Sequence, residues 1–398
     1  MKKIGKNRIL FITQWEYNDA LIQTYTLPYI HIIQSISDHY CYLIGTTKKS
    51  TVIKVKKKGS IILIEVPVSG EFLLLRWLAN IIFIRSVVRK KRIPIIHTLC
   101  TPAGSIGALL KMLNKKLFLV LDSVEPHAES MVESGTWMKN SVKFKLLFYM
   151  EKQQIKVADK IILAAEGMDR YIKEKYGMTI HDFQIKPACV DLDLFSYASV
   201  KDPELVMKYE LKDKITCLYT GKLGGFYWDS KLFEFIKKCE DYWGTQKFKF
   251  LMLSNVDDAH VNERRLNYGI SEHTIIKLFV PHVEVPKYMG LADFAVSPFK
   301  FVPSKRYSTP IKNGEYWALG LPIVITPKIS TDSDTIAENN AGAILDAFDN
   351  IGYMKVIKQI DLLLSSNTRE AIYAKIRPLA EKYRNFSIAE KVYRSIYD

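Results

Sequence analysis

The sequence predicts an α/β protein with two doubly wound parallel-sheet domains. Short apolar runs rich in β-branched residues alternate with longer helical stretches along most of the chain, which is the pattern of repeated βαβ units. One stretch without periodicity, 186–202, interrupts the alternation and marks a domain linker. The 398 residues suffice for two or three domains at roughly 150 residues each, and 48% hydrophobic with 25% charged residues is typical of a folded globular chain.

The first half of the chain contains the runs that we expect to form the first sheet. These buried strands are predicted at 8–13, 40–44, 61–66, 95–99, 117–122 and 160–164. Helical stretches lie between them, so the runs fit one parallel sheet covered on both faces. We assign residues 1–195 to this N-terminal domain.

A second alternating series begins after the linker. Its strands are predicted at 215–220, 248–254, 274–280, 294–297, 322–326 and 343–345. They assign residues 205–368 to a C-terminal domain, and the purely helical segment 369–398 is expected to pack back on the first domain. Ligands of open α/β sheets bind beyond the carboxyl ends of strands, so the loops that follow strands are the places to look for a site.

The net charge of +15 is concentrated near the start of the chain. Residues 1–110 carry 16 Lys and Arg against 5 Asp and Glu, a net +11, whereas the remaining 288 residues carry 41 against 37, or +4. The basic clusters at 54–58 and 89–92 would attract a polyanion such as an acidic lipid surface, or they form a solvated face. No RNA-recognition motif, helix-turn-helix or zinc spacing appears, so no nucleic-acid partner is expected.

Cysteine spacing and hydropathy bear on the compartment. The five cysteines are scattered and never form a CxxC pair, so neither a disulfide framework nor a metal site is expected, and a cytoplasmic location fits. Residues 77–84 form a charge-free apolar run of eight, well short of the roughly 20 residues that span a bilayer. With the basic cluster that follows it, this run could lie on an anionic membrane surface. The alternative is a buried helix of the first domain.

A glycine-rich loop follows the predicted strand 215–220. Its sequence TGKLGG places Gly221, Gly224 and Gly225 around Lys222. Glycines let the backbone approach an anion closely and a lysine can reach a phosphate, so the loop resembles a phosphate cradle. It lacks the GxxxxGK followed by Ser or Thr of a P-loop. The alternative is a tight turn with its lysine in solvent.

A marked helix follows in the segment 303–324. Ser308 or Thr309 is expected to cap a helix whose first residue is Pro310 and which ends at Gly320. Both ends of this helix are therefore signalled by the sequence.

The charges near this helix start are unusual. Lys305, Arg306 and Lys312 surround an N-terminus that already carries about half a positive charge. Such cations are unfavourable there unless an anion, such as a diphosphate, binds the helix start. Glu315, one turn into the helix, would then lie beside a group attached to that phosphate, such as a ribose. The alternative role of Glu315 is compensation of the helix dipole.

The same segment resembles the donor-site motif of the retaining GT-B glycosyltransferases, the group-one or family-four-like nucleotide-sugar glycosyltransferases. The motif S-x-P-x-K-x-x-E-Y-x-A-x-G-x-P is matched by Ser308, Pro310, Lys312, Glu315, Tyr316, Ala318, Gly320 and Pro322. Three other stretches match in the family's order, at 190–195, 220–223 and 282–298. Together the matches span about 190–326.

The resemblance implies a GT-B architecture, in which two Rossmann-like domains face a cleft. It implies a UDP- or GDP-linked nucleotide sugar as the donor substrate on the C-terminal domain, with no metal and no other cofactor. By this resemblance Lys222 and Lys312 contact the diphosphate as catalytic residues, and Glu315 binds the ribose. The further donor-binding residues that it implies are Gly221, Pro281, His282, Ser308, Thr309 and Ile311.

The sequence departs from the family pattern at two places. A second lysine is usual shortly after the glycine loop, where residues 224–228 read GGFYW. Many members also carry a glutamate eight positions before the ribose glutamate, and Tyr307 stands there. On the acceptor side, His127 in SVEPHAES resembles the family's catalytic histidine. The alternative for His127 is a loop histidine with a structural role.

These observations together predict transfer of a sugar from a nucleotide-diphosphate sugar to a glycan or lipid-linked acceptor, with retention, in surface polysaccharide biosynthesis. The expected location is cytoplasmic, with peripheral contact to the inner face of a membrane through the basic N-terminal domain. Two alternatives stay open. One is a GT-B sugar-nucleotide epimerase or an inverting transferase, and the other is a non-catalytic protein that binds polyanions or membranes.

Overall fold

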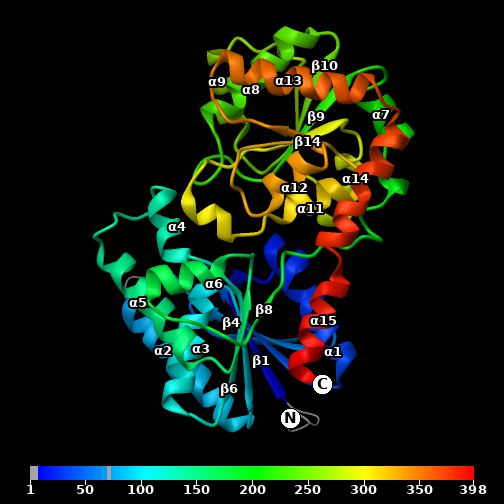
Figure 1. The fold of residues 1–398 in the computed structure, drawn as a ribbon. Helices are drawn as coiled ribbons and strands as arrows, with labels where there is room; N and C mark the ends of the chain where they lie inside the picture. Colours follow the sequence, from blue (N-terminus) through cyan, green and yellow to red (C-terminus); the bar gives the residue numbers. More distant parts are fainter. Residues whose placement is uncertain (1–7, 70–72) are drawn as a thin grey trace. The chain divides into compact units, whose positions relative to one another are not determined.

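The computed structural model of the protein describes residues 8–69 and 73–398. The chain forms two compact units (Figure 1): unit 1 comprises Met1–Ala188 and Phe386–Asp398, and unit 2 comprises Cys189–Asn385. Each unit has its own largely or wholly parallel sheet with helices on both faces, which confirms the predicted α/β fold class.

The described part of unit 1 contains an eight-stranded sheet in the order β3-β4-β2-β1-β5-β6-β7-β8. Neighbouring strands are parallel except β3 and β4, which form an antiparallel pair. The strands are β1 (Arg8–Glu16), β2 (Tyr40–Thr47), β3 (Lys54–Lys58), β4 (Ile61–Pro67), β5 (Ile95–Leu99), β6 (Phe118–Val124), β7 (Lys160–Leu163) and β8 (Phe183–Ile185). The apolar run of β1 is fully buried because both faces of the sheet are covered.

The helices of unit 1 cover the two faces of this sheet. They are α1 (Leu27–Ile36), α2 (Leu73–Lys90), α3 (Thr101–Leu113), α4 (His127–Glu133), α5 (Val142–Val157), α6 (Met168–Tyr171) and α15 (Phe386–Tyr397), with π-helical turns η1 (Ile22–Thr26) and η2 (Ile172–Tyr176). Helices α1 and α15 lie on one face and α2, α3 and α5 on the other (Figure 1). The connection from β1 to β2, which contains α1, runs toward one edge of the sheet, whereas the connections that contain α2, α3 and α5 run toward the other edge. Because such crossovers are right-handed, α1 lies on one face of the sheet and α2, α3 and α5 lie on the other.

Helix α2 contains the apolar run predicted at 77–84. Among the helices of the described residues, none is long and apolar enough for a membrane span.

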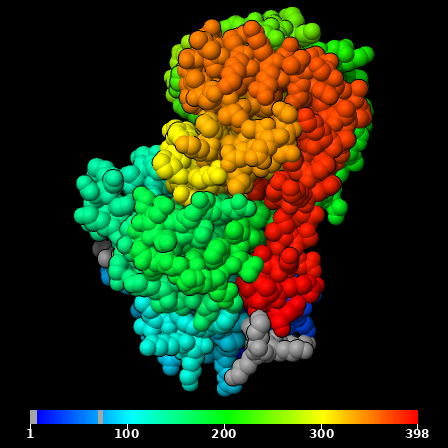
Figure 2. All heavy atoms as spheres, in the orientation of Figure 1, coloured from blue at the N-terminus to red at the C-terminus, as the bar shows by residue number. Residues whose placement is uncertain are grey.

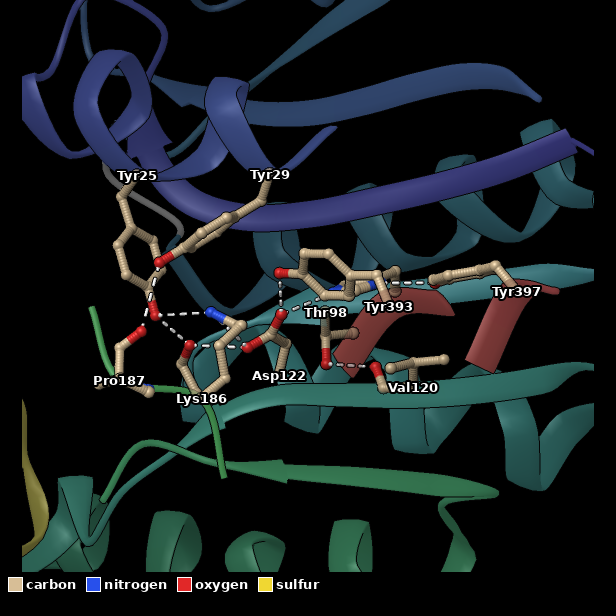
Figure 3. Close-up of polar contacts among 11 residues, drawn as sticks. Tyr25, Tyr29, Thr98, Val120, Asp122, Lys186, Pro187, Tyr393 and Tyr397 are labelled. Carbon is tan, nitrogen blue, oxygen red and sulfur yellow. Dashed lines mark hydrogen bonds and ion pairs between the residues drawn. The ribbon is translucent and has the colours of Figure 1, made fainter. Parts of the chain in front are cut away.

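Helix α15 belongs to unit 1 because its tyrosines complete a buried polar cluster there (Figure 3). Tyr393 Oη donates to Asp122 Oδ2 over 2.6 Å, and Tyr397 Oη lies 2.6 Å from His97 Nδ1. The other ring nitrogen of His97 lies 3.1 Å from Asp122 Oδ2. Figure 2 shows atoms of α15 at the molecular surface, so this helix is an outer layer of the unit.

The same cluster contains a buried ion pair. Lys186 Nζ lies 3.2 Å from Asp122 Oδ1 and 3.7 Å from the ring centroid of Tyr29, and both charged side chains are fully buried. Burial alone would raise the pKa of Asp122, but the Lys186 ammonium and His97 hold that pKa well below its usual range. The cluster therefore joins β6, the segment after β8, α1 and α15 through satisfied polar groups.

The described part of unit 2 contains a six-stranded sheet in the order β11-β10-β9-β12-β13-β14, parallel throughout. The strands are β9 (Ile215–Thr220), β10 (Phe248–Leu253), β11 (Ile275–Leu278), β12 (Phe294–Ser297), β13 (Ile323–Ile325) and β14 (Gly342–Ile344). Successive residues of β9 point to opposite faces, so Leu218 joins one apolar core while Cys217 and Tyr219 join the other.

Helices complete both cores of unit 2. The helices are α7 (Pro203–Lys208), α8 (Ser230–Trp243), α9 (Asp258–Asn267), α10 (Val285–Met289), α11 (Ile311–Ala318), α12 (Asp332–Glu338), α13 (Asn350–Ser365) and α14 (Arg369–Tyr383), with short 3₁₀ segments η3 (Tyr197–Ser199), η4 (His282–Glu284) and η5 (Pro303–Tyr307). Helices α8 and α13 pack on the face of Tyr219, whereas α11 and α14 pack on the face of Leu218. Helix α11 thus lies directly on the sheet beside β9.

The division between the units can be compared with the domain boundaries expected above. The chain passes from unit 1 to unit 2 after Ala188, inside the stretch 186–202, whereas the N-terminal domain was expected to reach residue 195. The helical segment 369–398 is shared between the units, because α14 belongs to unit 2 and α15 to unit 1. Only the last helix therefore returns to the first unit.

Candidate functional site

The glycine loop after β9 has the backbone conformation that only glycine adopts readily. Gly221 has φ +122°, Gly224 φ +74° and Gly225 φ +61°. The backbone N–H of Gly221 donates to Leu253 O over 3.0 Å, which ties the loop to the end of β10. Lys222, the residue predicted to contact a diphosphate, is exposed on this loop. The loop thus presents a cation at the carboxyl end of the central strand, where ligands of such sheets bind.

Helix α11 begins one residue later than predicted. Pro310 is its N-cap rather than its first residue, and neither Ser308 nor Thr309 caps it, so the capping prediction is wrong. Ser308 Oγ instead turns back toward Lys305 O, at 3.5 Å. Proline at the cap offers no side-chain acceptor, which leaves the first amides of the helix, beginning at Ile311, without a side-chain cap. Such an N-terminus favours an anion.

Tyr316 links this helix to the end of β9. Its hydroxyl accepts a hydrogen bond from Thr220 N over 3.0 Å and lies 3.0 Å from Thr220 Oγ1. Because the tyrosine is buried, the helix start and the glycine loop are held in one place.

The ammonium group of Lys312 lies in an aromatic cage between α11 and the glycine loop. Its Nζ is 4.1 Å from the ring centroid of Tyr227, 4.8 Å from that of Tyr219 and 5.6 Å from that of Phe299. A Cβ placed on Gly221 would be only 2.9 Å from this nitrogen. The glycine is therefore needed for the close approach of the lysine.

Lys312 Nζ is buried and has no hydrogen-bond partner within the described residues, although part of its stem is exposed. Burial lowers the pKa of Lys312 to about 7, and the charge of Glu315 opposes that decrease. An unpaired buried ammonium is costly, and an anionic ligand would supply the missing partner.

Glu315 lies one turn further along α11 and is also buried. Burial raises the pKa of its carboxyl to about 7, and Lys312 opposes that increase. The charges of the two side chains therefore influence each other although no hydrogen bond joins them, and burial shifts the pKa of each toward neutral pH. Perturbed pairs of this kind are typical of functional sites.

The two other cations expected at this helix start have separate partners. Arg306 Nη1 forms an ion pair with Asp334 Oδ2 at 2.7 Å and donates to Ser330 O, also at 2.7 Å. Lys305 is buried, with its Nζ 3.9 Å from the ring centroid of Phe226. The expectation that three cations crowd the helix start is therefore wrong for Arg306, which is directed to α12.

A buried hydrogen-bond network supports α11 from below, and the sequence reasoning missed it. Asn313 accepts from Ser297 Oγ over 2.6 Å and donates to Asp332 Oδ2 over 2.7 Å. Asp332 also pairs with Arg384. An asparagine within the helical run of the motif was the signal, since an amide at a buried helix position needs partners.

The loop expected to face a base is η4 with its flanking residues. Pro281 is exposed and is the N-cap of η4. His282 is half-buried, and its Nε2 has no hydrogen-bond partner in the part of the chain that is described. Burial lowers the pKa of His282, and the charge of Asp191 opposes that decrease.

His127 belongs to unit 1, whereas the residues described above belong to unit 2. It is the first residue of α4, and its Nδ1 is 3.6 Å from Glu125 Oε1. The neighbouring Ala128 N–H donates to buried Glu151, whose pKa burial raises to about 7. The structure thus brings together Gly221, Lys222, Lys312 and Glu315, while the catalytic role of His127 stays a prediction.

No group of three His, Cys, Asp or Glu side chains suited to a metal ion occurs among residues 8–69 and 73–398. All five cysteines are buried, and none of them forms a disulfide bond.

Comparison with known proteins points to one class of enzyme. Residues 224–378 match the sequence model of the family described as glycosyl transferases group 1. The fold is similar to that of sucrose-phosphate synthase from Thermosynechococcus elongatus, with a TM-score of 0.77, 14% identity and coverage of 98% of this chain and 99% of that chain. No curated protein sequence matches the chain.

Two other solved structures are similar over nearly all of the chain. WaaG, a glycosyltransferase involved in lipopolysaccharide biosynthesis, has a TM-score of 0.71 and 15% identity, with 98% of this chain and 99% of that chain covered. HepE from Anabaena in complex with UDP has a TM-score of 0.69 and 11% identity, again with 98% and 99% covered.

The two parallel-sheet units and their solved neighbours define a protein with the GT-B fold. The chain is a glycosyltransferase, and its C-terminal unit carries the match to group 1.

Proposed function

We propose that this chain transfers a sugar from a nucleotide-diphosphate sugar to a glycan or lipid-linked acceptor. The observation that carries the proposal is the unpaired, buried ammonium of Lys312, which lies at the uncapped start of α11 and against Gly221. A diphosphate in that position would accept a charge-assisted hydrogen bond from Lys312 and hydrogen bonds from amides at the start of α11, and the helix dipole would stabilise its charge. In this proposal Lys222, which is exposed on the glycine loop, contacts the outer face of the diphosphate.

Glu315 and the loop 281–283 extend the donor site in this proposal. The Glu315 carboxylate would accept hydrogen bonds from ribose hydroxyls, one helical turn from the diphosphate. Pro281 and His282 would lie against the base. UDP is the nucleotide that we favour over GDP, because the structure of HepE, which has the same fold, contains UDP.

The chemistry in this proposal is positional and electrostatic. The bond between the sugar and the phosphate breaks through an oxocarbenium-like state, and the negative charge that develops on the leaving diphosphate is stabilised by Lys312, Lys222 and the helix start. For a retaining reaction the acceptor hydroxyl attacks the face that the diphosphate leaves. His127 would act on the acceptor side, where its imidazole can hold or receive a proton.

The proposed setting is surface polysaccharide biosynthesis at the inner face of a membrane. The N-terminal unit is strongly basic, and α2 ends in the exposed Arg89 and Lys90. A basic surface of this kind is attracted to anionic lipid. WaaG, which has a similar fold, acts in lipopolysaccharide biosynthesis.

Thermal unfolding with UDP, GDP, ADP and CMP and their sugar conjugates tests the donor site. A nucleotide at about a hundred times its dissociation constant should add about 2.7 kcal/mol, which raises the melting temperature of a unit of this size by roughly 5–10 °C. The shift should disappear in Lys312→Ala and weaken in Glu315→Gln, while both variants stay folded. Full binding and activity in both variants would overturn the assignment of the site.

Product analysis tests the reaction class. Nuclear magnetic resonance of the product should show the anomeric configuration of the donor. An inverted product would contradict retention, and epimerisation of the nucleotide sugar without transfer would identify an epimerase instead.

A further inference from the structure

One layer of unit 1 presents mostly positive charges, and the exposed Asp159 that follows it pairs with Lys111 of α3 at 2.7 Å. Helices α2, α3 and α5 form this layer on one face of the sheet (Figure 1), and α3 packs against α5 while α2 and α3 line a common groove. The basic side chains of the three helices are Arg76, Arg85, Arg89, Lys90, Lys111, Lys143, Lys145, Lys152 and Lys156. Their single carboxylate, Glu151, is buried and hydrogen-bonded to Ala128 N and Tyr176 Oη.

Helix α5 adds an apolar stripe to this face. Met138, Val142, Leu146 and Tyr149 are 81%, 80%, 59% and 56% exposed. The spacing of four and three residues places Val142, Leu146 and Tyr149 along one side of the helix, and Met138 comes shortly before the helix. Lys143 and Lys145 are exposed beside the stripe.

Helix α2 has a comparable exposed side. Leu75, Leu78 and Ile82 are exposed at a spacing of three and four residues, and Ile82 is 69% exposed. Arg85 and Arg89 continue the same side toward the end of the helix, and a groove along it is lined by basic side chains next to Ile82. Neither arginine side chain forms a hydrogen bond or an ion pair with another residue of the described ranges.

Exposed apolar residues are ordinary when they are isolated, but rows at helical spacing flanked by cations form an amphipathic surface. A protein partner is the weaker explanation, because the cores of protein interfaces are depleted in lysine. An anionic bilayer accepts both features, since apolar side chains enter the headgroup region and lysines and arginines contact lipid phosphates.

We propose that the outer face of the α2–α3–α5 layer is a contact surface for an anionic lipid bilayer. The stripe of α5 and the apolar half of α2 enter the headgroup region, and the basic side chains around them bind anionic headgroups. The inference rests on the proposed membrane setting and names its surface. Strand β3, the other basic cluster, has no part in this surface. Its lysines flank only one valine, and Lys56 pairs with Glu65 at 2.9 Å.

Sedimentation with vesicles of phosphatidylcholine, alone or mixed equally with phosphatidylglycerol, tests the surface. The wild type should bind only the mixed vesicles. The double variant Lys143→Gln/Lys145→Gln should reduce the partition coefficient about 30-fold, which is about 2 kcal/mol at about 1 kcal/mol per basic residue. The double variant Val142→Ser/Leu146→Ser should reduce it about tenfold through lost apolar burial.

The matched control is Lys57→Gln/Lys58→Gln on β3, which removes the same charge from another exposed site. Binding within about twofold of wild type is expected for this control. Equal losses in the β3 and α5 charge variants would overturn the proposal, because binding would then follow net charge alone. Wild-type binding by both α5 variants, or equal binding to neutral vesicles, would also overturn it.

Light scattering tests whether a second copy of the chain, rather than a bilayer, covers this surface. A monomeric wild type is expected, and a dimer that Val142→Ser/Leu146→Ser dissociates would assign the stripe to self-association instead. All substituted residues are exposed, so each variant should melt like the wild type. The UDP-induced thermal shift should persist in each variant, so loss of vesicle binding is distinguishable from failure of the donor site.

Discussion

Replacement of Lys312 by methionine should stabilise unit 2 while it abolishes nucleotide binding. The lysine is the side chain that the proposed function needs most, yet its ammonium is buried against three aromatic rings without a hydrogen-bond partner among the described residues. Methionine has a similar shape, carries no charge and makes favourable contacts with aromatic rings. The substitution therefore removes the charge and keeps most of the packing.

The magnitude follows from the decrease in pKa. A fall of the Lys312 pKa from 10.5 to about 7 corresponds to about 4–5 kcal/mol of lost proton affinity in the folded state. Contacts of the ammonium with the three rings return about 1–2 kcal/mol. The remainder, about 2–4 kcal/mol, should raise the melting temperature of unit 2 by roughly 5–15 °C.

The pH dependence gives the sign of the effect. Between about pH 7 and pH 10.5 the unfolded chain holds a proton on Lys312 that the folded chain has released, so wild-type stability from this group rises with pH in that window. The advantage of Lys312→Met should be largest below pH 7 and should shrink by about 1.4 kcal/mol for each pH unit above it.

Calorimetric unfolding at about pH 6.5 and pH 9, with and without UDP, is the assay. The exposed Lys222→Met is the matched control, since it should lower UDP affinity with a stability change within about 0.5 kcal/mol. A Lys312→Met variant that melts at or below the wild-type temperature, or that still binds UDP, would refute the reasoning.

Three further predictions concern the glycine loop, the buried pair of α11 and the cluster under α15. Gly221→Ala forces alanine to φ +122° and places its Cβ 2.9 Å from Lys312 Nζ, so it should lower the free energy of unfolding by about 1–3 kcal/mol and weaken UDP binding in calorimetric titration. Gly224→Ala is the control, because it also has a positive φ but open space around its Cβ. Equal UDP affinities in the two variants would contradict a steric clash between the Cβ of residue 221 and Lys312. Glu315→Gln removes a negative charge that favours protonated Lys312, so Lys312 should lose its proton at lower pH. The loss of UDP affinity toward alkaline pH should therefore begin at lower pH than in the wild type. An unchanged profile of UDP affinity against pH would exclude this coupling between Glu315 and Lys312. Asp122→Asn removes the carboxylate that pairs with the buried ammonium of Lys186 and should destabilise unit 1 by about 3–5 kcal/mol in thermal unfolding. Partial recovery is expected when Lys186→Met is added, and strictly additive losses would show that the two groups do not interact.

The parallel sheets could be predicted because their strands are buried on both faces. Such strands read as continuous apolar runs, as in β1, β5 and β9, and turns or helix signals separate them. Strand β3 was missed because it is an exposed edge strand of lysines, whose composition signals only charge. Strand β8 was missed because three residues give no period.

The site residues that lie next to strand or helix ends could be predicted from the local sequence. Gly221, Lys222, Lys312 and Glu315 stand next to strand and helix boundaries that the sequence marks, and parallel strands end at one edge of their sheet. The aromatic cage could not be predicted, since Tyr227 and Phe299 come from separate loops that only the tertiary fold brings to Lys312. The helix cap was assigned wrongly because several residues before α11 were suitable, and the backbone selected Pro310.

The return of α15 to unit 1 has a consequence for the order in which the chain folds during synthesis. Unit 2 is continuous in sequence, so it can fold as soon as residues 189–385 have left the ribosome. Unit 1 has its whole sheet first in sequence, yet the hydroxyls of Tyr393 and Tyr397 that contact buried Asp122 and His97 are made only after unit 2. Without α15 the sheet leaves an apolar face uncovered and Asp122 lacks its tyrosine partner. A released chain that ends at residue 385 should therefore contain a folded unit 2 and a unit 1 that chaperones still recognise.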